Sequence, residues 1–145
     1  SYSQYDPVKK RVVTKNNHCK YENVCVVFKD MSFDPLVECK AENSLAYFFK
    51  KALSKNGLDI CGLRLVYLDE KNREEYRSVF HESIEMDGTW GKPVLAVVLR
   101  GLEATRKVES ILGHFNPEMA RRTDEKSLRA CFGRSRQQNC ALQIF

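Results

Sequence analysis

The three histidines are the first residues to consider for chemistry, because at neutral pH imidazole offers a nitrogen lone pair that can accept a phosphoryl group. His114 directly follows Gly113, which closes a predicted helix, and this position is typical of a partly exposed polar residue. His81 lies beside Glu82 on a polar helix face, and His18 lies in a polar N-terminal stretch. These sequence positions are typical of solvated side chains, so none of the three histidines is predicted to be a nucleophile.

The six cysteines are the other candidates for covalent or metal chemistry. Several lie inside apolar runs, where a buried thiol behaves as a small hydrophobic side chain. No pair shows the C-x2-C spacing that structural zinc sites use. We therefore predict free thiols in a reducing compartment and no metal site; the residues are Cys19, Cys25, Cys39, Cys61, Cys131 and Cys140.

Length and composition favour one globular domain, since the chain has 145 residues, 43% of them hydrophobic and 30% charged. The net charge of +5 comes from 24 basic and 19 acidic residues that are interspersed, so nucleic-acid binding is predicted to be unlikely. No apolar run approaches the roughly 20 residues that span a bilayer, and the polar first ten residues lack a signal-peptide core. We expect a cytoplasmic protein without a membrane partner.

Hydrophobic periodicity divides the chain into elements that alternate between strand and helix. The polar residues 1–22 form an N-terminal arm, with one edge strand expected around Val12 and Val13. Asn116 and Pro117 are expected to open a long polar loop that ends at Lys126. The predicted strands are 23–28, 58–68, 94–99 and 140–145, and the predicted helices are 44–57, 69–82, 102–112 and 127–132.

This order predicts an α+β fold of the ferredoxin-like βαββαβ type, with a four-stranded antiparallel sheet covered by helices and one extra helix. The runs 23–28 and 94–99 are almost continuously apolar. Such runs are typical of strands that are buried on both faces, so we expect them to be neighbours at the centre of the sheet.

Three motifs carry a resemblance to a known family. They are Gly91–Gly101, Ile111-Leu112-Gly113 followed by Asn116-Pro117, and Ser127-Leu128-Arg129-Ala130-Cys131-Phe132-Gly133. In this order they resemble the nucleoside diphosphate kinases, which carry phosphate on a histidine. The resemblance runs from about Asn23 to Phe145, and it implies a nucleoside diphosphate kinase-like domain over 23–145 that follows the arm 1–22.

The resemblance also implies a vestigial nucleotide-binding site made of Lys29, Tyr76, Arg129 and Asn139. Lys29 matches a phosphate-binding lysine, but a solvated charge at the end of a strand is the alternative. Tyr76 matches a tyrosine that borders the phosphates, or it anchors its helix to the core. Arg129 matches an arginine that clamps phosphate oxygens through its planar fork, or it is a solvated helix-end charge. Asn139 matches an asparagine near the sugar, or it is a turn former.

Three departures from the family pattern oppose phosphate transfer. Glu109 stands where the family has a second phosphate-binding arginine, Phe115 replaces a hydroxyl residue, and Leu142 takes the position of the histidine. Leucine has no lone pair, so it cannot carry a phosphoryl group. Placing the nucleophile on another histidine would disturb the in-line geometry that phosphoryl transfer needs.

The function predicted from these features is that of a catalytically inactive nucleoside diphosphate kinase-like domain, a pseudoenzyme that acts as a protein interaction or assembly module. The alternative is a nucleotide-binding regulatory domain without phosphotransfer. We expect no cofactor and at most weak binding of magnesium nucleotide, with a protein partner or self-association instead. The expected contact regions are residues 114–126 and the basic arm Lys9–Lys20, although Phe115 and Met119 could instead fill the vacated nucleotide cleft.

Overall fold

The computed structural model of the chain describes residues 2–6, 11–15, 20–29, 41–80, 89–134 and 141–144. The strands are β1 (Tyr2–Asp6), β2 (Arg11–Lys15), β3 (Tyr21–Phe28), β4 (Asp59–Tyr67), β5 (Pro93–Leu102) and β6 (Ala141–Ile144). The helices are α1 (Ala41–Phe49), α2 (Arg73–Phe80), α3 (Ala104–Leu112), α4 (Pro117–Thr123) and α5 (Leu128–Phe132), with a π-helical segment η1 (Lys50–Lys55) and a 3-10 turn η2 (Glu70–Asn72).

The main sheet has four strands in the order β4-β5-β3-β6, and all neighbouring pairs are antiparallel. This arrangement confirms the predicted α+β fold. The two apolar runs are indeed central neighbours, with Val26 opposite Val97 and Val24 opposite Leu99. β6 adds to the other side of β3 and places Leu142 in register opposite Val27.

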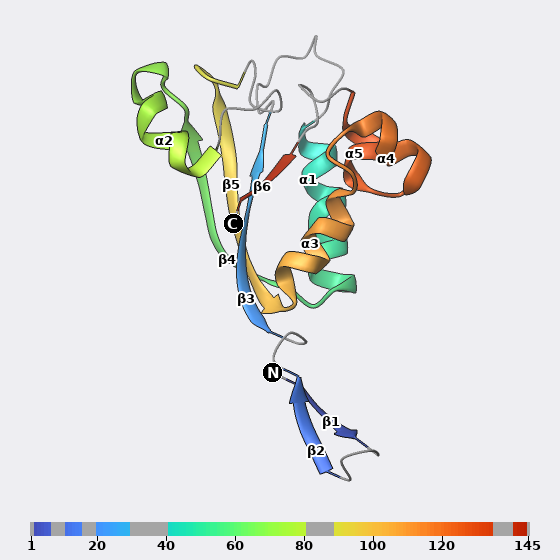
Figure 1. The fold of residues 1–145 in the computed structure, drawn as a ribbon. Helices are drawn as coiled ribbons and strands as arrows, with labels where there is room; N and C mark the ends of the chain where they lie inside the picture. The colour runs from blue at the N-terminus through green and yellow to red at the C-terminus, as the bar shows by residue number, and fades with distance from the viewer. Residues whose placement is uncertain are drawn as a thin grey trace.

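Helices cover the two faces of the sheet unequally, as Figure 1 shows. On one face the larger core packs Val24, Val26 and Phe28 of β3 against side chains of α1 and α3, such as Phe48 and Leu112. On the other face a smaller cluster of buried side chains forms next to α2, from Val27, Leu68 and Val94 with Tyr76 and Trp90 packed against it. The alternating directions of side chains along a strand explain why adjacent residues of β3 serve different clusters.

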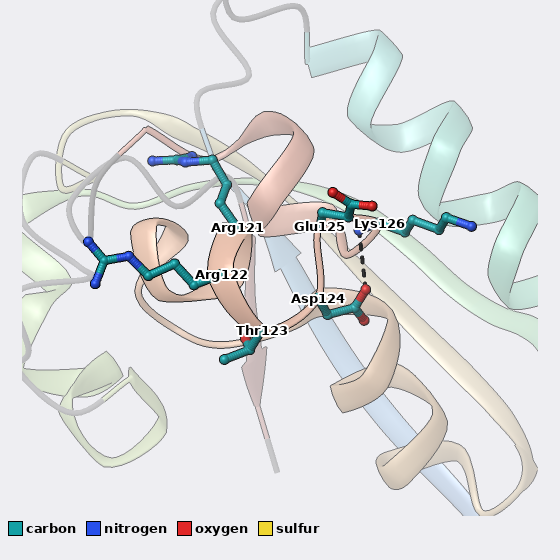
Figure 2. Close-up of a pocket in the computed structure, with 6 residues that line it drawn as sticks. All are labelled: Arg121, Arg122, Thr123, Asp124, Glu125 and Lys126. Carbon is teal, nitrogen blue, oxygen red and sulfur yellow. Dashed lines mark hydrogen bonds between the residues drawn. The ribbon is translucent and has the colours of Figure 1, made fainter.

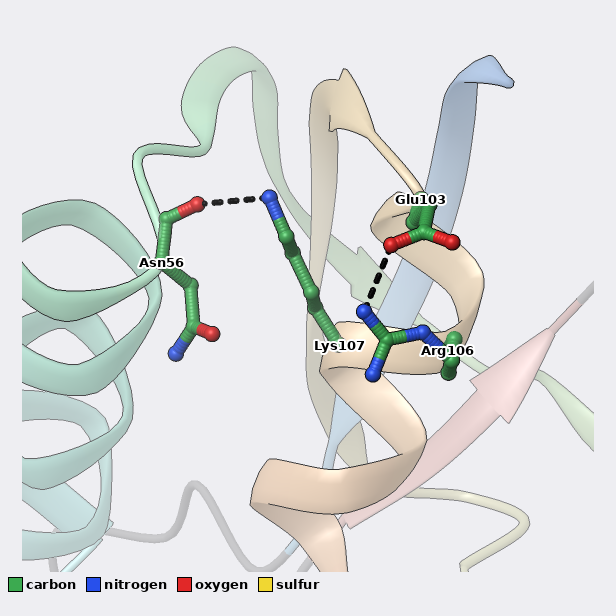
Figure 3. A network of polar contacts seen from close by, with 4 residues as sticks. All are labelled: Asn56, Glu103, Arg106 and Lys107. Carbon is green, nitrogen blue, oxygen red and sulfur yellow. Dashed lines mark hydrogen bonds and ion pairs between the residues drawn. The ribbon is translucent and has the colours of Figure 1, made fainter. Parts of the chain in front are cut away.

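A tight turn connects β5 to α3 and fixes the start of this helix. Glu103 adopts a left-handed backbone with φ of 52°, which is uncommon for a residue with a side chain. Its N–H donates to the carbonyl of Lys20, and its carboxylate pairs with Arg106 at 2.6 Å. One turn further, Lys107 donates to the carbonyl of Asn56 at 3.0 Å, so α3 is tied to the end of η1 (Figure 3).

The predicted loop between Asn116 and Lys126 is wrong, because residues 117–123 form helix α4. The side chain of Asn116 accepts the N–H of Glu118, and Pro117 occupies the first helical position, where its missing N–H costs nothing. Pro117 and Ala120 are the buried residues of this helix. The helix is only seven residues long and has few apolar residues, which hides its periodicity from a sequence pattern.

The N-terminal arm contains two strands, so the expectation of one edge strand is also wrong. β1 and β2 pair with each other in a separate two-stranded sheet, with Tyr5 opposite Val12. The first predicted helix begins earlier than expected, at Ala41, and continues through η1 to a cap at Asn56, followed by Gly57 with φ of 63°. The predicted end of the second helix at 81–82 lies outside the described residues.

Candidate functional site

Arg129 is one of the residues of the predicted nucleotide-binding site, and its guanidinium is bound to backbone carbonyls of the protein. The residue is 7% exposed. Nε and Nη2 donate to the carbonyl of Ala141 at 3.3 and 3.0 Å, and Nη1 donates to the carbonyl of Gly113 at 2.8 Å. The planar fork that could clamp a phosphate therefore joins three segments of the chain: α5, the start of β6 and the end of α3.

Close packing around Gly113 keeps these segments in place. Gly113 has a φ of 80°, and a Cβ atom built on it would lie 2.3 Å from Oγ of Ser127. Ser127 is the N-cap of α5: its hydroxyl donates to the carbonyl of Asp124 and accepts the N–H of Ala130. Only glycine fits at 113, both for its backbone conformation and for the space that Ser127 fills.

Lys29 follows Phe28, which lies opposite Ala141, the residue whose carbonyl Arg129 binds, whereas Tyr76 lies on α2. Lys29 directly follows β3 and is 4% exposed, so it is not a solvated charge at a strand end. Tyr76 lies on α2, where its ring is half-buried with its centroid 6.2 Å from that of Trp90. The guanidinium of Arg73 lies over the Trp90 ring at 5.3 Å. Tyr76 thus takes part in the aromatic packing that holds α2 on the sheet.

The positions that the sequence predicts to depart from the family pattern are found in the last turn of α3, just after α3 and on β6. Glu109 is exposed in the last turn of α3, and its carbonyl accepts the N–H of Gly113. Phe115 is 49% exposed and stacks on His114 with ring centroids 4.4 Å apart. Nδ1 of His114 accepts the N–H of Asn116 at 3.0 Å, so that nitrogen is occupied in the turn before α4. Leu142 belongs to β6.

Three residues considered from the sequence, Asn139, His18 and His81, lie outside the described residues. Among the described residues there is no group of three or more His, Cys, Asp or Glu side chains that could hold a metal ion. In the same part of the chain, no helix is long and apolar enough to cross a membrane.

The surface around α4 combines exposed apolar and charged side chains. Met119 is 38% exposed and Phe115 49% exposed, so neither fills an internal cleft in this structure. The end of α4 and the turn after it line a shallow hollow of about 380 Å³ from Arg121 to Lys126. Figure 2 shows Arg121 and Arg122 extending on one side of this turn and Lys126 on the other.

The sequence did not reveal how the turn after α4 is held against α1. The carbonyl of Lys126 accepts the hydroxyl of Tyr47 and the ammonium group of Lys51, the latter at 2.7 Å. The Lys51 ammonium also lies 4.6 Å from the centre of the Tyr47 ring. These contacts join residues more than seventy positions apart, which explains why no local pattern signals them.

Solved structures with similar folds include nucleoside diphosphate kinases. The enzyme of Aquifex aeolicus matches with a TM-score of 0.68 at 22% identity, over 86% of this chain and 85% of that one. The enzyme of Halobacterium salinarum, solved in complex with CDP, matches with a TM-score of 0.62 at 21% identity, over 86% and 77% of the two chains. At these identities the likeness shows the fold alone.

A curated relative and a family model extend the comparison to the sequence. The chain is 37% identical to dynein axonemal assembly factor 8 of Xenopus laevis over 81 residues, which are 56% of this chain and 5% of that protein. The matching family model, described as nucleoside diphosphate kinase, covers residues 42–141. Since this is more than half of the sequence, the chain belongs to the nucleoside diphosphate kinase family.

Proposed function

We propose that this chain is a nucleoside diphosphate kinase-like domain that does not transfer phosphate and that serves as a protein interaction or assembly module. The observation that carries the proposal is the environment of Arg129. Its buried guanidinium donates three hydrogen bonds to backbone carbonyls. A phosphate would have to compete with these bonds and then leave the carbonyls of Gly113 and Ala141 without their donors, which is costly in a buried site.

Two further residues support the absence of phosphate transfer. Leu142 stands where the family carries its histidine and offers no nucleophilic atom. Glu109 stands where the family has an arginine, and its carboxylate would repel a nucleotide phosphate. The printed contacts of Arg129 and Tyr76 therefore favour a role of these two residues in the fold over a role in nucleotide chemistry.

The surface around α4 is the contact region that we assign to a protein partner. Phe115 and Met119 expose apolar surface next to Arg121 and Arg122, and interfaces are enriched in aromatic residues, methionine and arginine. The relative from Xenopus laevis is an assembly factor for axonemal dynein by its name. We accordingly extend the proposal to a partner of that kind, an axonemal dynein subunit or its assembly intermediate.

A phosphoenzyme assay tests the enzymatic half of the proposal. The purified chain is incubated with γ-labelled ATP and magnesium, and the label is followed through acid and base treatment, with the Aquifex aeolicus enzyme as positive control. We expect no acid-labile label on the chain. The variant Leu142→His alone is not expected to reach full activity, because Glu109 and Phe115 are unchanged. Acid-labile label on any histidine of the unmodified chain would refute the proposal.

A binding experiment with a matched control tests the interaction half. The double variant Phe115→Ala with Met119→Ala removes the exposed apolar side chains of the α4 surface, whereas Leu102→Ala removes a half-exposed leucine at the end of β5. We expect the unmodified chain and Leu102→Ala to bind purified axonemal dynein subunits, and the double variant to lose this binding with little change in its unfolding free energy. Equal binding by all three proteins would exclude the α4 surface as the contact.

A further inference from the structure

The described helices cover only part of the sheet face that carries α2. Val27, Leu68 and Val94 form the buried cluster next to α2, toward one end of the sheet. Figure 1 shows α2 beside this end, whereas the other labelled helices lie on the opposite side of the sheet. A sheet with an apolar face is stabilised by a second layer packed over it. The part of this face beyond α2 is therefore a surface on which a further element can pack.

The strand register places three uncharged residues in one row across this part of the face, which we call the open row: Gly62, Val98 and Cys25. Val98 of β5 lies opposite Gly62 of β4 on one side and opposite Cys25 of β3 on the other. All three residues are half-buried. Paired residues share a face of the sheet, and Cys25 packs against the cluster next to α2. The open row therefore lies on the face of α2.

Gly62 makes the β4 end of the open row a shallow depression. Within 4 Å, a Cβ atom built on Gly62 would meet only atoms of Val98, at 3.4 and 3.5 Å. Glycine inside a strand marks a bulge or a place where another backbone or a ligand approaches closely. Gly62 adjoins the bulge that follows Ile60, and the space above it is open as well. An element of a partner can therefore approach the sheet closely at this point.

Two exposed arginines flank the open row from opposite directions. Arg64 lies two residues beyond Gly62 on β4, and Arg100 lies two residues beyond Val98 on β5, toward the other end of the sheet. The rise of a strand puts their rows about 13 Å apart. An α-helix with its side chains is about 10 to 12 Å wide. A helix that crosses the strands over the open row therefore fits between the two arginines, whereas α2 blocks a long helix parallel to the strands.

The charges around the open row favour an acidic partner. The guanidinium of Arg100 lies 5.5 Å from the centre of the Tyr21 ring, which is 61% exposed. Asp59 lies opposite Arg100 at the start of β4 and is the acidic residue of β4 on this face. Arg64 lies opposite Ala96, so its pairing partner on β5 carries no charge. An uncharged centre with a charged rim is typical of protein interfaces.

We infer that the open row docks an amphipathic helix of a partner protein, whose apolar stripe is flanked on both sides by acidic residues. The stripe covers Gly62, Val98 and Cys25, and the flanking carboxylates pair with Arg64 and Arg100. The docked helix completes on this face the layer that α1 and α3 form on the other. The inference does not depend on the absence of phosphate transfer or on the α4 surface, because none of these residues belongs to either.

Selection from a displayed peptide library on the full chain tests the inference. The library holds helices of about 18 residues, or five turns, with leucine at helical spacing and with glutamate, glutamine or lysine at each flanking position. Binders are counter-selected against the variant Arg64→Glu with Arg100→Glu. We expect the remaining peptides to be enriched in glutamate on both flanks. A selection that leaves no binders, or that enriches lysine, would overturn the inference.

Fluorescence anisotropy then measures the affinity of one selected peptide for matched variants. Arg64→Glu with Arg100→Glu replaces two attractions by repulsions, so we expect at least about tenfold weaker binding. The control Lys50→Glu with Lys55→Glu makes the same change of charge on η1, whose Ala52 packs in the core on the opposite face of the sheet. This control should bind the peptide as the unmodified chain does.

Gly62→Val tests the depression without changing the charge. Valine favours strands and fills the space above the backbone, so we expect a folded protein that binds the peptide about tenfold less tightly. Gly62→Ala is the milder variant, and circular dichroism with thermal unfolding confirms that each protein is folded. Unchanged affinity in both the charge variant and Gly62→Val would overturn the inference. So would displacement of the peptide by single-stranded oligothymidylate, which would assign the surface to nucleic acid. Both results are independent of the phosphoenzyme assay and of binding to dynein.

Discussion

Arg129 links separate segments of this fold through hydrogen bonds, and its contribution to the free energy of unfolding can be measured. Hydrogen bonds from a charged donor contribute more than neutral ones, and removal of Arg129 takes its donors from the buried carbonyl of Ala141 and the part-buried carbonyl of Gly113. Arg129→Ala should lower the free energy of unfolding by about 3 kcal/mol in urea denaturation. Arg129→Lys keeps the charge but not the planar fork, so it should recover only part of the loss. An alanine variant as stable as the unmodified chain would show that these bonds contribute little.

Burial raises the pKa of the Cys25 thiol. The folded state disfavours the thiolate, so this contribution to stability is complete at low pH and declines as the pH rises above the pKa of the unfolded thiol, about 8.5. At pH 8, iodoacetamide should modify the exposed Cys61 and Cys131 first and Cys25 slowly. Mass spectrometry of the peptides measures the three rates. Equal rates for the three thiols would contradict this reading.

At the scale of single elements, α4 depends on its cap because it is short. The side chain of Asn116 accepts the N–H of Glu118 at 3.0 Å. Asn116→Ala should lower the free energy of unfolding by about 1 kcal/mol, the usual cost of losing such a cap. Asn116→Asp keeps an acceptor oxygen and serves as the matched control. Urea denaturation measures the free energy of unfolding of both variants, provided that its dependence on urea concentration is unchanged. Equal losses of stability in the two variants would exclude capping as the cause.

The elements that sequence patterns predicted correctly are those with a clear hydrophobic period. β3 and β5 appear as apolar runs, and α3 shows buried Ala104, Val108, Ile111 and Leu112 at helical spacing. α4 was missed although its start carries an Asn-Pro signal, because its charged residues offered no period. The arm hairpin was missed because Tyr2–Asp6 is polar and forms a strand only by pairing with Arg11–Lys15.

The sequence was enough to predict which residues belong to the candidate site, but it was not enough to predict their contacts. The positions of Lys29, Tyr76 and Arg129 could be named from motifs along the sequence. Their surroundings could not, because Arg129 reaches carbonyls sixteen positions before it and twelve positions after it. Such contacts follow from the packing of α3, α5 and β6, which no local pattern contains.

For the molecule as a whole, the structure leads us to expect weak nucleotide binding. The guanidinium of Arg129 is engaged by carbonyls, and Glu109 adds a repulsive charge. Isothermal titration calorimetry with ATP, with and without magnesium, should give a dissociation constant in the millimolar range or above. Submicromolar binding that disappears in a folded Arg129→Lys variant would instead favour the nucleotide-binding regulatory domain.

The bonds to the Lys126 carbonyl have a consequence for proteolysis. The end of α4 and the turn after it, from Arg121 to Lys126, are exposed and contain three trypsin sites, so trypsin would be expected to cut there first. Cleavage after Lys126 requires the protease to seat the same carbonyl that Tyr47 and Lys51 hold. This peptide bond should therefore resist limited digestion, and Tyr47→Phe, which removes only the hydroxyl, should make it more susceptible. If the unmodified chain and Tyr47→Phe are cut after Lys126 at the same rate, the hydrogen bond from Tyr47 does not protect this peptide bond.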